Sequence, residues 1–78
     1  MRKKEWKLII TFPTTEDAMA MELVCKKRQI EGRLIPVPRS ISAGCGLAWC
    51  AGPENRSILL DVMEHEGIRK EAIQECEV

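Results

Sequence analysis

The sequence predicts an α+β fold in which two helices cover one face of a four-stranded antiparallel sheet. Apolar segments that favour strands and segments with helical periodicity follow one another in the order strand, helix, strand, strand, helix, strand. The chain thus divides into two similar halves. Right-handed crossovers with both helices on one face would join these halves into a split βαβ sandwich of the ferredoxin-like type (βαββαβ).

The first half of the chain begins with a predicted strand over Trp6–Phe12, rich in apolar and β-favouring residues, with Trp6, Leu8 and Ile10 on one face of the pleat and Ile9 on the other. A helix is expected over about Glu16–Gln29, after Pro13. Thr14 and Asp17 have the spacing of a capping box, in which aspartate replaces the usual glutamate. This helix can cover the sheet with one apolar arc, which contains Ala18, Ala20, Met21, Val24 and Cys25.

The next strand is predicted over 33–37, after Gly32 has ended the helix. Pro36 and Pro38 confine this second strand to an edge of the sheet, because proline cannot donate to the ladder of hydrogen bonds. An exposed edge strand could pair with a second copy, so we expect a monomer or a weak homodimer.

The second half of the chain contains a third strand over Leu47–Ala51 and a helix over about Glu54–Glu66, which Gly67 ends. The helix has an apolar stripe that should be buried, formed by Ile58, Leu59, Val62 and Met63. Cys76 and Val78 alternate with charged residues at the end of the chain and predict a short fourth strand.

Length and charge narrow the classes of function. The 78 residues suit a single domain, 1–78. Twelve basic and twelve acidic residues give a formal net charge of zero, and the basic cluster Arg2-Lys3-Lys4 is short, so nucleic-acid binding is disfavoured. The apolar run Leu8–Phe12 is too short for a secretion signal or a membrane span. We therefore expect a cytoplasmic protein with no membrane partner.

The four cysteines should be reduced in such a protein, so a disulfide framework is not expected. They contain no Cys-x-x-Cys pair, and the single histidine, His65, lies within a predicted helix, so no metal site is predicted. No cofactor is expected either. Cys25 lies on the apolar arc of the first helix and is interpreted as a core thiol.

Cys45 is the strongest candidate for chemistry. It lies between Gly44 and Gly46 in a loop of small residues, six positions after Arg39. The glycines remove side-chain bulk and let backbone N–H groups approach a thiolate or an incoming sulfur atom. The bland alternative is a flexible turn with an incidental small residue. In the predicted topology this loop shares a sheet edge with the start of the first helix, whose positive end would favour the thiolate together with Arg39. Carboxylates in the first turn of that helix would partly cancel the effect.

Two residues that follow the loop have open roles. Cys50 either packs in the sheet or acts as a second thiol, provided that the loop folds back over the strand. Trp49, like Trp6 in the first strand, is expected to anchor a sheet face, although an exposed Trp49 could instead form a docking contact.

Several segments together resemble a known family, the selenium or sulfur carrier protein-like family of small bacterial domains. These segments are Ile9–Thr15, Ala18 and Glu22, Arg33–Arg39, and the Ile-Ser-Ala-Gly-Cys-Gly-Leu-Ala run Ile41–Ala48. The resemblance covers most of the chain. It implies a carrier that accepts sulfur or selenium on Cys45 as a persulfide or selenopersulfide and passes it on, with a donor and an acceptor protein as partners. Trp49 and Cys50 depart from the family's pattern, so no role for Cys50 follows from the resemblance.

Two functions therefore remain as alternatives. The first is a sulfur or selenium carrier, which needs a nucleophilic thiolate on an accessible loop and little else. The second is a small interaction or regulatory module in which the loop cysteine is incidental. No histidine, serine or carboxylate pair converges in the sequence, so a stand-alone enzyme is less expected than a carrier or accessory protein.

Overall fold

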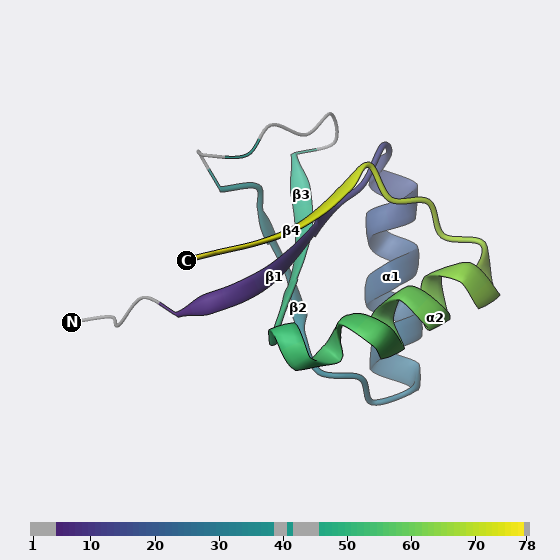
Figure 1. Cartoon of the computed structure of the whole chain (residues 1–78). Helices are drawn as coiled ribbons and strands as arrows, with labels where there is room; N and C mark the ends of the chain where they lie inside the picture. Colours follow the sequence, from purple (N-terminus) through teal and green to yellow (C-terminus); the bar gives the residue numbers. More distant parts are fainter. Residues whose placement is uncertain (1–4, 39–40, 42–45, 78) are drawn as a thin grey trace.

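The computed structural model describes residues 5–38, 41 and 46–77 and contains four strands and two α-helices. Figure 1 shows their arrangement. The elements are β1 (Trp6–Thr11), α1 (Thr15–Lys27), β2 (Arg33–Pro36), β3 (Leu47–Ala51), a short 3-10 turn (Pro53–Asn55), α2 (Arg56–Glu66) and β4 (Ala72–Glu77). The predicted order of strands and helices is confirmed.

The strands form one open sheet in the order β2-β3-β1-β4. Each neighbouring pair is antiparallel, and the registers place Ile10 opposite Trp49 and Ile73, and Ile35 opposite Ala48. β2 is an edge strand, as its prolines predict.

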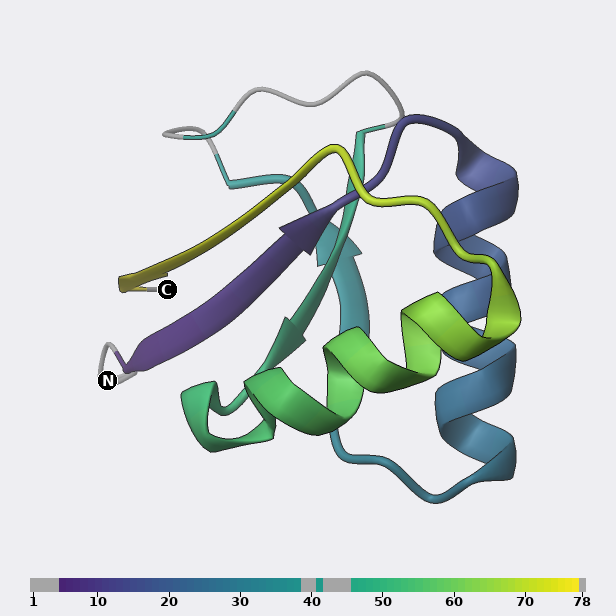
Figure 2. The same cartoon turned by 45° about the vertical axis from the view of Figure 1, so that its right-hand side comes forward.

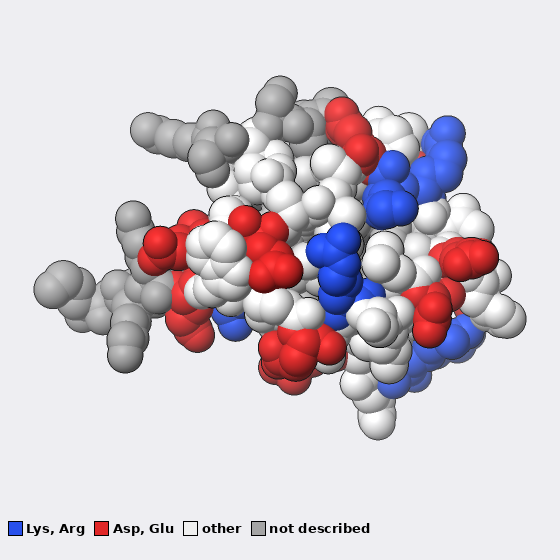
Figure 3. All heavy atoms as spheres, in the orientation of Figure 1, with Lys and Arg blue, Asp and Glu red and all other residues white. Residues whose placement is uncertain are grey.

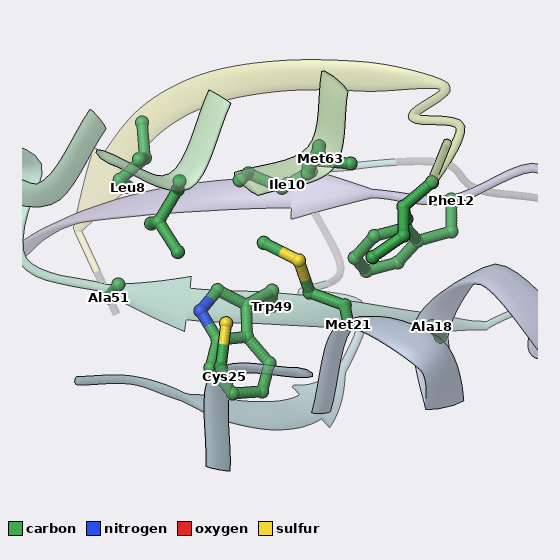
Figure 4. Close-up of a cluster of buried hydrophobic side chains, with 11 residues drawn as sticks. Leu8, Ile10, Phe12, Ala18, Met21, Cys25, Trp49, Ala51 and Met63 are labelled. Carbon is green, nitrogen blue, oxygen red and sulfur yellow. The ribbon is translucent and has the colours of Figure 1, made fainter. Parts of the chain in front are cut away.

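Both helices lie on the same face of the sheet, which is plain when Figures 1 and 2 are compared. The main core fills the space between them, and Figure 4 shows Trp49, Met21 and Phe12 pointing into it. Its buried members are Leu8, Ile10, Phe12, Ala18, Met21, Cys25, Trp49, Ala51, Leu59, Met63 and Ile68. Trp49 is only 3% exposed, so it anchors this face and is not a docking contact.

The start of α1 agrees with the sequence, whereas its end does not. Thr14 is the N-cap, and its hydroxyl accepts a hydrogen bond from the backbone N–H of Asp17. The helix ends at Lys27 instead of reaching 29, because Gln29 turns into the left-handed region at φ 58° and Ile30 donates back to the carbonyl of Cys25. Gly32 therefore does not end the helix. Gly67, by contrast, ends α2 in the left-handed conformation that was predicted.

Three further expectations need correction. β4 runs over Ala72–Glu77 and is longer than the predicted strand at the end of the chain. Its sequence is mostly polar, so the pattern gives little sign of a strand, and backbone pairing with β1 holds this strand in place. Ile58 is 48% exposed, so the buried stripe of α2 is narrower than its apolar pattern predicts. Trp6 is 57% exposed and donates its indole N–H to Glu75 at 2.6 Å, and so it does not anchor the core.

Candidate functional site

The candidate site lies at the sheet edge where β1 and β2 end and β3 begins. Thr11 is paired with Ala48, and Pro36 with Leu47. The backbone N–H of Val37 then donates to the carbonyl of Gly46 at 3.0 Å and extends the hairpin by one pair. Because α1 starts just after β1, its first turn and the base of the β2–β3 connection share this edge, as the topology predicted (Figure 1).

Gly46 is the described residue nearest to the predicted thiol. Its φ of 76° lies in the left-handed region, and among the described residues none except its chain neighbour comes within 4 Å of the position that a side chain would take. This conformation favours glycine, so the backbone alone explains why glycine occupies position 46. Cys45, Gly44 and Arg39 lie outside the described residues, and the reactive thiol therefore stays a prediction.

Asp17 forms the most polar cluster near this edge, in the first turn of α1. Its carboxylate accepts from the hydroxyl of Thr14 at 2.6 Å, and from the backbone N–H and guanidinium of Arg69 at 3.1 and 3.2 Å. Asp17 is only 8% exposed. The hydrogen bonds from Thr14 and Arg69 hold the pKa of Asp17 below its ordinary value of 3.8.

This cluster changes the electrostatic expectation for the edge. The sequence suggested that the carboxylates of the first turn would oppose the positive end of α1, but the charge of Asp17 is paired with Arg69. Sequence reasoning missed Arg69, because 52 residues separate it from Asp17 and only the path of the chain after α2 brings the two together. The capping-box spacing was the only signal that identified Asp17 itself.

The Asp17 cluster predicts a loss of stability in acid. Because the folded pKa is depressed below 3.8, the stabilisation is present above that pH and is lost as pH falls through the folded pKa. Asp17→Asn should therefore lower the urea midpoint of unfolding at pH 7, and the gap from the wild type should shrink below about pH 4. Asp61→Asn, the same change on the exposed face of α2, is the control and should have little effect at either pH. A gap for Asp17→Asn that stays constant down to pH 2 would contradict this assignment.

Cys50 points to the face of the sheet that carries no helix, and it is buried at 7% exposure. Burial raises the pKa of the Cys50 thiol, and the cations of Lys7 and Arg33 oppose this only in part. It lies four residues beyond Gly46, or about 13 Å at roughly 3.3 Å per residue. A disulfide needs Cα atoms within about 7 Å. A bond from Cys50 to the residue before Gly46 would thus require β3 to move, and the role of second thiol stays a prediction.

The other two described cysteines pack among apolar side chains. Cys25 lies on the buried side of α1, as expected, and is fully buried. Burial raises the pKa of its thiol to about 11. Cys76 is partly exposed on β4 and packs on the same sheet face as Cys50. Both are distant in sequence from the loop that contains Cys45, and the position of neither indicates a chemical role.

The described part of the chain contains neither a cluster of metal ligands nor a helix that could cross a membrane. Within it, no three His, Cys, Asp or Glu side chains gather as metal ligands would. None of its helices combines the length and apolar character that crossing a membrane requires. On the face drawn in Figure 3, acidic and basic side chains lie among one another.

Comparison with known proteins gives one match. The model of the family described as "Putative Se/S carrier protein-like" matches residues 7–75. This range begins in β1, ends in β4 and includes the whole β2–β3 connection. No curated protein and no solved structure matches the chain.

Proposed function

Because this chain belongs to the Se/S carrier protein-like family, we propose that it carries sulfur or selenium between two partner proteins, with Cys45 as the acceptor. The observation that carries the proposal is the family match across residues 7–75. Gly46 adds support from the structure, since its left-handed conformation explains why a glycine directly follows the proposed acceptor. Gly44 and Arg39 are proposed as supporting residues on the sequence pattern alone.

The proposed transfer is a thiol exchange that needs no added oxidant. The Cys45 thiolate attacks the terminal sulfur of a persulfide on the donor protein. A new S–S bond forms on Cys45, the S–S bond of the donor breaks, and the donor cysteine leaves as a thiolate. The acceptor protein then repeats the exchange with the persulfide on Cys45. A selenopersulfide would follow the same balance with selenium as the transferred atom.

The electrostatics of the sheet edge support a thiolate at this position. The first turn of α1 lies at the same edge as the base of the β2–β3 connection, and the positive end of a helix favours nearby anions. Arg69 already compensates the carboxylate of Asp17, which would otherwise oppose this effect. A thiolate present at neutral pH is the form that attacks sulfur.

The strand order supports the finer fold class as well. In β2-β3-β1-β4, each strand–helix–strand unit has a strand of the other unit inserted between its two strands. This is the split βαβ arrangement, so we propose a ferredoxin-like sandwich.

The test of the carrier is direct loading. Reduced protein is incubated with a cysteine desulfurase and cysteine, and intact mass spectrometry followed by digestion locates any added sulfur. We expect a gain of one sulfur atom on Cys45, which Cys45→Ser abolishes. Cys76→Ser, which removes the partly exposed thiol of β4, should load like the wild type.

Two results would contradict the carrier. One is no gain of mass in the wild type, and the other is equal labelling of all four cysteines. Either would favour the interaction module with an incidental loop cysteine. Loading that starts at a lower pH than that of a free peptide thiol would further support the thiolate.

A further inference from the structure

The helix-free face of the sheet is not a bare surface. Ile9 and Ala48 point to this face and are fully buried, and Cys50 beside them is 7% exposed. Both helices pack on the opposite face and cannot provide this burial (Figure 2). We call these three residues the rear cluster. Something other than a helix must cover it.

Four partly buried apolar side chains pack against the rear cluster, namely Ile35, Val37, Ile41 and Cys76. Ile35 and Cys76 belong to strands β2 and β4. Val37 and Ile41 belong to the connection between β2 and β3, so part of this connection contacts the rear face instead of pointing into solvent.

Backbone hydrogen bonds fix the path to Ile41. Val37 is held at the end of the hairpin by its bond to Gly46. The N–H of Ile41 also donates to the carbonyl of Pro38 at 2.9 Å. This bond holds Ile41 close to the end of β2, beside the sheet face on which its side chain packs.

We propose that Ile41 is a positioning residue, which anchors the β2–β3 connection on the rear cluster and thereby sets where Cys45 is presented to a partner. The effect on presentation rests on the proposed function, whereas the anchoring does not. Ile41 precedes Cys45 by four residues and Gly46 follows it directly, so these two described residues hold both ends of the segment that carries the acceptor. Holding the two ends of a segment in place lowers the conformational entropy that binding to a partner costs.

The first experiment tests the anchor through the thiol that it helps to cover. The native protein is treated with an alkylating reagent, and digestion with mass spectrometry follows the rate at each cysteine. Ile41→Ala should raise the rate at Cys50 about fivefold, because the removed side chain covers the cluster in which Cys50 lies. Ile58→Ala, the same change at an exposed position on α2, should leave Cys50 as in the wild type.

Cys25 reports global unfolding in the same experiment, because it is fully buried in the main core. A rise at Cys50 with Cys25 unchanged supports the anchor. No change at Cys50 overturns it. A parallel rise at both cysteines also overturns it, since the rear cluster would then open only when the whole domain unfolds.

The second experiment tests presentation by measuring sulfur loading against donor concentration. Ile41→Ala should raise the donor concentration at half-maximal rate about fivefold, with the final extent of loading unchanged. Ile41→Leu, which keeps an apolar side chain of the same size, should restore the wild-type value. Unchanged kinetics in Ile41→Ala would overturn the positioning role even where Cys50 becomes exposed. A wild type that does not load would overturn the proposed function, and the anchor would still be judged by Cys50 alone.

Discussion

Replacing Gly32 with alanine is expected to lower the free energy of unfolding by about 3 kcal/mol. Gly32 has a φ of 137°, a conformation that residues with a side chain rarely adopt. A methyl group there would lie 2.5 Å from Nε1 of Trp49 and 2.7 Å from its Cε2. Trp49 is buried in the main core and has no room to move aside, so backbone strain and overpacking add together. The measurement is urea unfolding followed by circular dichroism.

A second substitution separates the two causes. Phenylalanine lacks the Nε1 of Trp49, which is buried and has no hydrogen-bond partner among the described residues. Trp49→Phe should therefore relieve the clash and leave the strain. We expect Gly32→Ala to cost about 1 to 2 kcal/mol less in a Trp49→Phe background than in the wild type. Full additivity of the two substitutions would show that contact with the indole does not account for the loss.

Phe12→Ala should have an equally large effect, about 3–5 kcal/mol. Phe12 is fully buried at the junction between β1 and α1, and its ring fills the main core at the end nearest the candidate site (Figure 4). A domain of 78 residues has a total stability of roughly 4–12 kcal/mol, so one cavity here removes a large part of it. Urea and thermal unfolding measure the loss.

Leu23→Ala is the matched control for Phe12→Ala. Leu23 is 67% exposed on the outer surface of α1, and its truncation should change the free energy of unfolding by less than about 0.5 kcal/mol. If Phe12→Ala and Leu23→Ala gave similar losses, the core would not be centred on the space between helices and sheet. Phe12→Leu should fall between them, because leucine leaves a smaller cavity than alanine.

Local patterns were sufficient to predict most elements of the fold. The alternation of Leu8, Ile9 and Ile10 assigned the faces of β1 correctly, because successive side chains of a strand point to opposite sides. Thr14 was identified as a cap from its spacing to Asp17, and its hydroxyl does accept a hydrogen bond from the backbone N–H of that residue. Such signals lie within one turn or one strand and so can be read from the sequence.

The wrong predictions concern positions where contacts with distant segments outweigh the local sequence pattern. Gly32 appeared to be a helix stop. Glycine is needed there instead because a side chain would collide with the indole of Trp49 on β3. β4 has too few apolar residues to be recognised over its full length, and pairing with β1 supplies the missing stabilisation. For the candidate site, the sequence identified Cys45, its glycines and the sheet edge shared with the first helix, and the structure adds the pairing of Asp17 with Arg69 and the packing of Ile41 on the rear face.

The sequence by itself determined the order of the elements, the faces of the strands, the family and the candidate thiol, because these depend on local periodicity and on a contiguous motif. Only the tertiary structure decided that Arg69 neutralises Asp17 and that the rear face of the sheet is covered at Ile41. Asp17 and Arg69 are 52 residues apart, and the cluster under Ile41 combines residues of two strands, β1 and β3. The formation of these contacts depends on how the strands and helices pack, which no local pattern encodes.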